Sequence, residues 1–475
     1  MRKSIGTLMV LAFVIIAFGF AQPVSAQITV ELIDIGTLGY KHSIARDMNN
    51  LGHIAGMSPV AEHVNHVFLW TEETGMMDLG TLGGNFGEVF GINDLDQIVG
   101  YTRISTDPSI TDFHAFLWSD GVMTDLGTLG GTLSMAYDIN NLGQVVGYSK
   151  TAEGYNHAFL YENGEMKDLG TLGGTSSFAR RINEVGQIIG QSRTASGEEH
   201  AVMWENGKLI DLGTLGPGWY ARPIAINELG QVVGYCVDSS NQIIQHATLW
   251  DYPRAIDLGT LGGMFSSAFD INNLGQIVGG SHTEDYKIHP VLWEGKDMID
   301  LGVISGPSGT ARFINDKGVI AGDYLTDTGE GRNFIWTEQY GNIELPNIGG
   351  TRSWVYDLNE NNQILGYAQT ATLESHAIQW TLTIPQPEDP VSSIREEIDE
   401  IISTGDLGAN EANAFNGPLT GAEHQIEKDN TAAAINGFNA FINQVEAFNK
   451  AGKISNEDAA TLIGMANEAI AALGG

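Results

Sequence analysis

Cysteine and basic residues are scarce in this sequence, and each scarcity excludes a class of protein. Cys236 is the only cysteine, so no intrachain disulfide can form and a buried core must stabilise the fold. Lysine and arginine number 23 against 58 aspartate and glutamate residues, which gives a formal net charge of −35. Nucleic acid and anionic membrane surfaces repel such a chain, so we expect neither as a partner.

Recognisable catalytic and metal-binding motifs are also lacking. The sequence contains no DxDxDG calcium loop, no P-loop, no HExxH zinc motif and no GxSxG nucleophile elbow. Carboxylates are numerous, but their separation depends on the fold, so no catalytic pair can be chosen from them. The sequence therefore assigns no catalytic residue.

Long apolar runs are lacking except at the N-terminus. Basic residues at positions 2 and 3 precede an apolar run over residues 8–20, and the small-residue sequence VSA ends at Ala26. This order is typical of a secretory signal peptide, here residues 1–26, cleaved before Gln27. A retained membrane anchor is the alternative, although the run is short for a membrane span. We therefore expect a secreted, extracellular protein that has no membrane contact beyond the signal peptide.

An internal repeat dominates the rest of the chain. The run DLGTLGG at residues 125–131 recurs in altered forms that begin at positions 34, 78, 125, 168, 211, 257, 300 and 344, so successive copies lie 43 to 47 residues apart. Most copies are followed by the Asn of DIN, the Gly that ends QVVG and the His of HAFLW, in that order. A fixed period in this range indicates a propeller, a solenoid or an array.

Each repeat predicts four short strands. In the third repeat, residues 136–139, 144–149, 157–161 and 165–169 are rich in β-branched and aromatic residues and are bounded by turn residues. Asn163-Gly164 favours a hairpin turn between the last two strands. The step from the landmark Gly to the His varies from 10 to 14 residues between repeats, which marks an exposed loop. Four antiparallel strands in about 44 residues form one propeller blade.

The ends of the repeat region predict how the ring closes. Residues Ile28–Ile33 match the fourth strand of a repeat, whereas the last repeat reaches Trp380 without a fourth strand of its own. The N-terminal strand is therefore expected to complete the last blade. We expect an all-β propeller of eight four-stranded blades over residues 27–384. Seven blades, or closure by Thr381–Ile384, are the alternatives.

The residues before DLGTLGG resemble those of a known family. Runs such as His114–Trp118 (HAFLW) and His157–Leu160 (HAFL) are similar to the HAF family of extracellular repeats, over roughly residues 30–380. The seventh repeat departs from the pattern, with the run Asn333-Phe334-Ile335-Trp336 and with VISG in place of TLGG. The resemblance implies a secreted, propeller-forming protein and no particular activity.

The propeller pattern ends near Trp380, and a small helical domain is expected after it. Residues 385–393 read as a stiff, Pro-rich, acidic linker, and residues 394–475 as three or four helices. Phe438, Phe441, Ile442, Val445 and Phe448 have helical spacing and are expected to be core residues. Ser455 with Asp458 resembles a capping box. Residues 402–473 resemble the FIMAH domain of secreted proteins, which implies an accessory or interaction role.

The repeated His and Asn residues are expected to be structural. Each occupies the same place in a different repeat, so the histidines should be spread around the ring, whereas zinc needs its ligands close together. We expect one buried His hydrogen bond per blade, and we interpret the Asn residues as turn caps. The histidines are His66, His114, His157, His200, His246, His289 and His376, and the Asn series runs from Asn49 to Asn359.

Carboxylates just before the DIN isoleucine are the candidate metal ligands. If the first strand of each blade is innermost, side chains at this position can line the central channel, where four carboxylates and water could hold Ca²⁺. Outward salt bridges explain the same residues equally well. The fourth repeat has Arg181 at this position, and the candidates are Asp47, Asp138, Asp270 and Asp357.

Aromatic residues on the loops give the candidate ligand-binding surface. The tight turns should lie on one face of the propeller, and the variable loops and the DLG-to-DIN crossovers on the other. Aromatic side chains around a concave mouth suit stacking on sugar rings or gripping a peptide, although they also close the ends of blade cores. The candidates are Tyr40, Phe86, Trp219, Tyr220, Phe265, Arg352 and Trp354, with Tyr155 and Tyr286 on variable loops.

These observations predict a secreted, non-catalytic binding or scaffold protein that presents a propeller face to a glycan or protein ligand. The alternative is an extracellular propeller enzyme, such as a polysaccharide lyase or hydrolase, with its active site at the variable-loop face. No cofactor is expected apart from the candidate Ca²⁺. The ligand and the oligomeric state cannot be predicted from the sequence.

Overall fold

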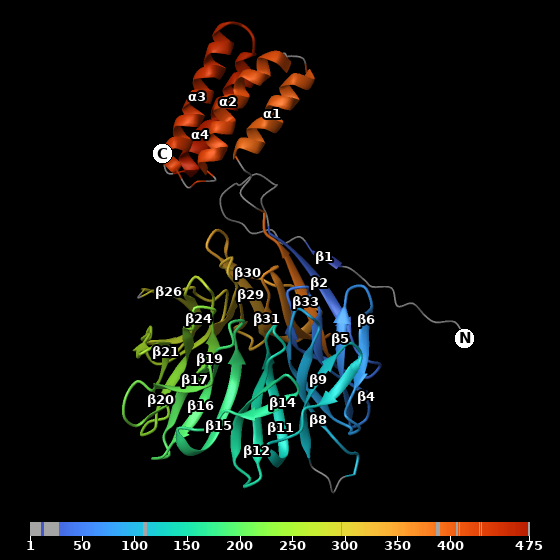
Figure 1. Ribbon diagram of the computed structural model, residues 1–475. Coiled ribbons are helices and arrows are strands. Elements are labelled where there is room, and N and C mark those ends of the chain that lie inside the picture. The colour runs from blue at the N-terminus through green and yellow to red at the C-terminus, as the bar shows by residue number, and fades with distance from the viewer. Residues whose placement is uncertain are drawn as a thin grey trace, which may run out of the picture. The chain divides into compact units, whose positions relative to one another are not determined.

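The computed structural model describes residues 11–13, 28–107, 112–295, 297–385, 390–404, 407, 409–426, 428 and 430–473. The chain forms two compact units, here called the β unit, which includes Thr29–Thr383, and the helical unit, which includes Ile384–Gly475 (Figure 1). Most of the expected signal peptide, residues 1–10 and 14–26, lies outside the described residues. Its described part is β1 (Leu11–Phe13), which pairs with β2 (Thr29–Gly36). In the described part of the chain, no helix is long and apolar enough to cross a membrane.

The β unit consists of consecutive antiparallel sets of four strands, as the repeat predicts. The first four sets are β3–β6 (Ile44–Met48, Ile54–Ala61, Val64–Thr71, Gly75–Gly80), β7–β10 (Gly87–Ile92, Ile98–Arg103, Phe113–Ser119, Val122–Asp125), β11–β14 (Gly130–Ile139, Val145–Thr151, Asn156–Glu162, Glu165–Asp168) and β15–β18 (Gly173–Ile182, Ile188–Thr194, Glu199–Glu205, Lys208–Gly213). The next sets are β19–β22 (Trp219–Ile226, Val232–Asp238, Gln245–Asp251, Arg254–Asp257), β23–β26 (Gly262–Ile271, Gln276–Thr283, Ile288–Glu294, Asp297–Asp300) and β27–β30 (Ser308–Ile314, Ile320–Leu325, Gly331–Thr337, Gly341–Glu344).

The last set combines strands from both ends of the β unit. β31 (Gly349–Leu358), β32 (Gln363–Thr370) and β33 (Ser375–Thr383) are completed by β2, which pairs antiparallel with β33 from Thr29↔Thr383 to Gly36↔Ala377. The sequence prediction that the N-terminal strand completes this set is therefore confirmed. Residues Thr381–Thr383 are the end of β33, so they do not form a separate fourth strand.

The first strands of successive sets surround a common axis. β3, β7, β11, β15, β19, β23, β27 and β31 contact one another in this order, and β31 also contacts β3. We call these the inner strands. Figure 1 shows the strands of the β unit arranged around this centre.

Every inner strand has a bulge near its end. The register with the second strand shifts by one residue between Ala45 and Asp47, between Ala136 and Asp138, and at the equivalent place in the other sets. A bulge inserts an extra residue and re-aims side chains locally. The landmark Gly of the second strand lies opposite, and in the third set a Cβ on Gly147 would lie 1.9 Å from the Met135 carbonyl oxygen. The close approach of the two strands explains why this landmark is glycine.

The landmark Asn residues link each set to the next. In the third set, the Asn140 Oδ1 accepts the backbone N–H groups of Leu142 and Gln144, which confirms the predicted turn cap. The Nδ2 of each Asn also donates to the backbone oxygen of the Asn in the following set at 3.0–3.1 Å, and the series returns from Asn359 to Asn49. This link between sets was not predicted.

The residue after each landmark Asn forms a parallel series at the Asn turns. Its side-chain oxygen accepts the backbone N–H of the equivalent residue in the preceding set. The residues are Asn50, Asp94, Asn141, Glu184, Glu228, Asn273, Asp316 and Glu360. Asn, Asp and Glu can all supply this acceptor, and Asn50, Asn141 and Asn273 also donate from Nδ2 to a neighbouring Asp carboxylate.

The repeated histidines bind the Asp of DLG, as the structural interpretation predicts. Seven His Nδ1 atoms lie 2.7–2.9 Å from the Asp carboxylates, and the last pair joins His376 of β33 to Asp34 of β2. The side chains are partly exposed, so these bonds are less buried than expected. The seventh set lacks the pair because Arg332 occupies the place of the His, opposite Tyr324. Its Nε lies 3.8 Å from the Glu344 carboxylate, which also accepts the Tyr324 hydroxyl at 2.6 Å. The histidines therefore have structural partners.

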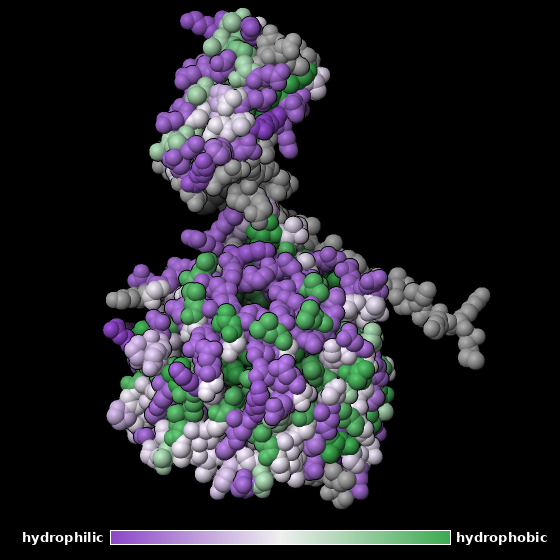
Figure 2. All heavy atoms as spheres, viewed as in Figure 1, coloured by the Kyte–Doolittle hydropathy of each residue, from purple (hydrophilic) through white to green (hydrophobic). Residues whose placement is uncertain are grey.

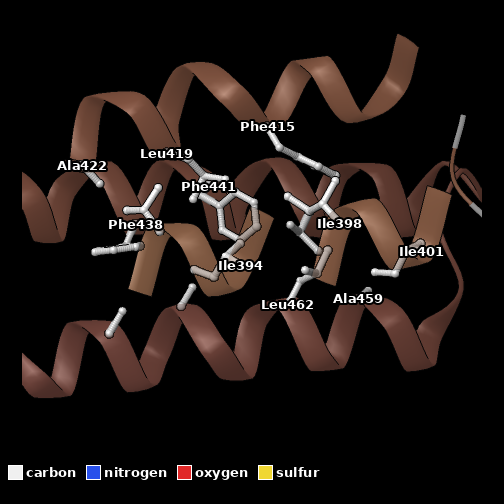
Figure 3. Packing of buried hydrophobic residues seen from close by; sticks show 14 of the residues in the cluster. Ile394, Ile398, Ile401, Phe415, Leu419, Ala422, Phe438, Phe441, Ala459 and Leu462 are labelled. Atoms are coloured by element: carbon white, nitrogen blue, oxygen red, sulfur yellow. The ribbon is translucent and has the colours of Figure 1, made fainter. Parts of the chain in front are cut away.

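The helical unit contains four described helices, α1 (Pro390–Thr404), α2 (Ala409–Ile426), α3 (Thr431–Lys450) and α4 (Asn456–Ala472). α1 begins at Pro390, inside the segment expected as linker, and proline is favoured in the first helical turn. The predicted core stripe is confirmed, because Phe438, Phe441 and Val445 are buried against the other helices (Figure 3). Ser455 caps α4 by accepting the Asp458 N–H, as predicted.

Candidate functional site

A cavity of about 300 Å³ lies on the axis of the β unit. Its walls come from the inner strands at the bulge, where two consecutive residues of a strand both reach the cavity, as in Arg46-Asp47 and Phe269-Asp270. The bulge residues that line it are Arg46, Phe90, Ile224, Phe269, Arg312 and Tyr356. The residues one position later are Asp47, Asp138, Arg181, Ala225, Asp270, Phe313 and Asp357.

The four predicted carboxylates are thus brought together around one cavity, but they bind the backbone. The Asp138 Oδ1 accepts the N–H of Ile139 at 3.0 Å and its Oδ2 accepts the N–H of Ile182 in the next set at 2.9 Å. Asp270 and Asp357 repeat this bridge, and Asp47 accepts the N–H of Ile92. Each carboxylate therefore joins neighbouring sets. The alternative that these residues form outward salt bridges is wrong.

Burial raises the pKa of each of these carboxyl groups. Desolvation outweighs the backbone hydrogen bonds and the positive charge of Arg181, and it raises the pKa of Asp138 to about 6 and that of Asp270 to about 7. Burial likewise raises the pKa of Asp357 to about 6. The pKa of Asp47 is raised by burial and by the nearby Asp357 carboxylate. Near neutral pH the cavity therefore holds part of these groups in the protonated form.

The described part of the chain contains no cluster of ligands for the calcium ion that the sequence suggested. Within those residues, no group of three or more His, Cys, Asp or Glu side chains is placed to hold a metal ion. The carboxylates lie around the cavity on different strands and already accept backbone N–H groups. The guanidinium of Arg181 is a positive charge that lowers the pKa of Asp138, Asp47 and Asp270 alike.

Arginine or an aromatic residue occupies the bulge position in every set except the one with Ile224. The guanidinium carbon of Arg46 lies 5.7 Å from the Tyr356 ring centre, and that of Arg312 lies 5.5 Å from the Phe269 ring centre. Arg46 also binds Glu88 at 2.6 Å, and Arg312 binds Asp323. These cation–π contacts and ion pairs hold the side chains in place around the cavity. Sequence analysis missed this position because the bulge, which turns it inward, leaves no sequence signal.

The predicted aromatic surface is not one cluster. Trp219 contacts His246 and packs against the core between its own set and the preceding one. Phe265 contacts His282, and Phe86 contacts Tyr101 and Phe113. Tyr220 lies beside Arg222, and Tyr40 and Arg352 are exposed. Trp354 differs, since it lines a second cavity of about 180 Å³ together with Arg312 and Tyr324. Arg312 lines both cavities, so Trp354 is the predicted residue nearest to the central site.

Sequence analysis also missed an arc of exposed aliphatic residues on the Asn-turn face. Two residues after the landmark Asn, six consecutive sets carry side chains that are 60–70% exposed, namely Leu51, Leu95, Leu142, Val185, Leu229 and Leu274. β33 ends on this face, and Figure 2 shows apolar side chains around a hollow there. The recurring N-x-L-G motif was the available signal. This arc is a large exposed apolar feature for a soluble surface.

The raised carboxyl pKa values predict a fall in stability with increasing pH. The folded state keeps protons on Asp138, Asp270 and Asp357 that the unfolded chain, with aspartate pKa near 3.8, has released. This contribution is complete below about pH 4 and is lost as pH rises through about 6 to 7. The hydrogen bonds that His114 and His246 donate to the Asp125 and Asp257 carboxylates raise the pKa of these histidines, so their contribution to stability is also lost as pH rises. We expect a higher melting temperature at pH 5 than at pH 8.

Asp270→Asn should flatten that profile, because the Asn side chain does not titrate in this pH range. The shift from 3.8 to about 7 corresponds to up to about 4 kcal/mol between the ends of the range. Asp251→Asn, a change at an exposed strand end, should leave the profile unchanged. Calorimetry from pH 4.5 to 8 measures both. A profile that rises with pH, or is equally steep in Asp270→Asn, contradicts the prediction.

Comparison with known proteins adds a family for the helical unit. Residues 391–471 match the model of the FIMAH domain, as the sequence resemblance implied. No curated protein matches the chain. The β unit is similar to the β-propeller domain of the trilobed protease from Pyrococcus furiosus, with 10% identity, coverage of 64% of this chain and 98% of that chain, and a TM-score of 0.42.

Two lectins are also similar. The BP39L lectin from Burkholderia pseudomallei has 10% identity, coverage of 65% and 100% of the two chains, and a TM-score of 0.37. The six-bladed Aleuria aurantia lectin has 9% identity, coverage of 68% and 95%, and a TM-score of 0.27. At TM-scores this low the likeness carries no argument about function, and the propeller architecture rests on the strand topology described above.

Proposed function

We propose that this chain is a secreted, non-catalytic binding protein that holds a glycan or protein ligand at the central cavity of a propeller. The observation that carries the proposal is a contrast between scaffold and cavity positions. The landmark Asn is the same in every repeat, and the His–Asp pair is present in all sets but one. The bulge position instead carries Arg, Phe, Tyr, Arg, Ile, Phe, Arg and Tyr from the first set to the last.

Variation of this kind is what a binding site on a repeat scaffold requires. Identical residues from each repeat would form a symmetric ring, whereas these residues give the cavity charged, aromatic and aliphatic sides. Pockets that bind small ligands are mostly apolar with a few well-placed polar groups. The cavity is more polar than that, because Arg46, Arg181, Arg312 and four aspartates line it together with Phe90, Phe269 and Tyr356, so it suits a ligand with both polar and apolar parts.

We further propose that the β unit is an eight-bladed propeller of HAF-type repeats. In support of eight blades, each four-strand set donates one Asn hydrogen bond to the next, and the series returns from the last set to the first. In support of HAF repeats, the His and Asp that define the resemblance bind each other in seven sets. The FIMAH domain would supply a second contact with a partner. The expected signal peptide supports a location outside the cell.

The alternative, a propeller lyase or hydrolase, has one observation in its favour. Buried carboxyl groups with raised pKa values are candidate acids and bases. However, both oxygens of Asp138, Asp270 and Asp357 accept backbone N–H groups, which leaves them poorly placed to exchange protons with a substrate. These hydrogen bonds favour binding over catalysis.

A glycan array with the full chain tests the proposal. Trp354→Ala should reduce the signal at least tenfold, because Trp354 shares Arg312 with the central cavity. Trp219→Ala is the matched control and should keep the signal, because Trp219 packs against the core between its own set and the preceding one. The proposal is abandoned if the native chain binds no glycan or if Trp354→Ala binds as the native chain does.

A further inference from the structure

We propose that the central cavity binds the carboxylate-bearing ring of an acidic sugar, with Arg181 as the residue that binds the carboxylate. The inference rests on the proposed function and names the class of its ligand. The source of the ring, either a free uronic acid or a residue of an acidic polysaccharide, has the same chemistry at the site.

Arginine is concentrated on the inner strands of a chain that is otherwise strongly acidic. The sequence has twelve arginines, and six of them lie on inner strands, namely Arg46, Arg180, Arg181, Arg222, Arg312 and Arg352. Arginine is the side chain best suited to carboxylates, because its planar guanidinium forms two parallel hydrogen bonds with them. A chain with net charge −35 would not gain solubility from gathering cations at its centre.

Arg181 is available for a ligand. Arg46, Arg222 and Arg312 each form an ion pair with an acidic side chain. In the described residues, Arg181 forms no ion pair, and its hydrogen bond is to the Arg180 carbonyl oxygen at 3.3 Å. Arg181 lines the cavity and is exposed to solvent.

The carboxyl groups around the cavity do not compete strongly for this cation. Their oxygens are engaged by the backbone of two adjacent sets, and burial raises their pKa values toward neutrality. A protonated carboxyl group can also donate a hydrogen bond to an anion. A cationic ligand would instead face the guanidinium groups of Arg46, Arg181 and Arg312 across the same cavity.

The remaining walls favour a ring over a small inorganic anion. Phe90, Phe269 and Tyr356 line the cavity, and aromatic side chains pack well against the C–H faces of pyranose rings. A volume of about 300 Å³ is at the small end of ligand pockets and suits one or two sugar rings. Charge and shape together therefore specify a ring with a carboxylate.

Titration calorimetry with the full chain tests this class directly. Glucuronate should bind at least tenfold more tightly than glucose, which has the ring without the charge, and than acetate, which has the charge without the ring. An oligogalacturonate distinguishes the two sources of the acidic ring. Binding of the oligomer alone indicates an acidic polysaccharide, whereas equal binding of the free acid indicates a single sugar. No binding of either acid at millimolar concentration overturns the inference, and so does equal affinity for glucuronate and glucose.

Substitution then assigns the residue. Arg181→Gln should weaken the binding of the acidic sugar at least tenfold, whereas Arg254→Gln, which removes an exposed arginine of β22, should not change it. Equal affinities in the native chain and a folded Arg181→Gln variant contradict the assignment. If that variant does not fold, the comparison of glucuronate with glucose in the native chain still tests whether the cavity binds acidic sugars. Array signals confined to neutral glycans would reject the acidic sugar and leave the proposed binding function standing.

Discussion

A chain that begins at Thr37 is expected not to fold to a stable monomer, whereas one that begins at Ile28 should fold like the full chain. The shorter chain lacks β2, whose Val30, Leu32, Ile33 and Ile35 are buried at 4–9% exposure. Burying each such side chain contributes about 1.5–3 kcal/mol, so the loss is about 6–12 kcal/mol. The total stability of a protein is about 5–15 kcal/mol.

The same deletion uncovers the edge of β33, since β2 is its partner over most of its length. Unpaired edges promote association with other chains. Size-exclusion chromatography, circular dichroism and thermal unfolding should show an aggregated or largely unfolded product. The chain that begins at Ile28 is the control, because it lacks only the expected signal peptide and its short β1 strand. Equal melting temperatures for the two chains would show that β2 does not stabilise the β unit.

Asn140→Asp is expected to destabilise the β unit by about 3 kcal/mol or more, the cost of an unpaired charge in a buried hydrogen-bond network. Asn140 is 2% exposed. Its Nδ2 donates to the Asn183 carbonyl oxygen at 3.1 Å and to the Gln144 Oε1 at 2.9 Å. Aspartate keeps the Oδ1 that caps the turn but replaces this donor with a charged oxygen that faces two acceptors.

Asn141→Asp makes the same chemical change one residue later and serves as the control. Its Oδ1 accepts the Asp94 N–H at 2.8 Å, and aspartate keeps this acceptor but loses the hydrogen bond from Nδ2 to the Asp94 carboxylate at 3.2 Å. We expect a change of about 1 kcal/mol or less, since the side chain is partly exposed to solvent, which screens the added charge. Urea denaturation of both variants measures the difference. Similar midpoints for the two variants would mean that the Asn series contributes little to stability.

The scaffold was predictable because it is repeated. Eight copies of a motif with nearly constant spacing specify four strands per repeat, the loop that varies and the turns. Asn163 and Gly164, for example, both have the positive φ of the predicted hairpin turn. The prediction that the N-terminal strand completes the last set followed from the absence of a fourth strand in the last repeat. The helical core followed from the spacing of Phe438, Phe441 and Val445.

The candidate site was predictable only in part. The four carboxylates were expected near the axis and lie there, because they precede a landmark whose place was known. Their partners were not predictable, since the N–H groups that bind Asp138 and Asp270 belong to the next repeat and depend on how repeats pack. Arg46, Arg312 and Tyr356 were missed because a bulge turns an additional residue inward, and strict alternation assigns it to the other side of the strand.

The bulge has a consequence for engineering. The additional residue of a bulge is left out of the strand pairing, so its side chain can be exchanged without disturbing the hydrogen bonds that hold the inner strand to the second strand. The residues concerned are Arg46, Phe90, Tyr137, Arg180, Ile224, Phe269, Arg312 and Tyr356, one from each set. All of them except Tyr137 and Arg180 line the central cavity, so randomising those six positions would vary the chemistry of one pocket on an unchanged frame.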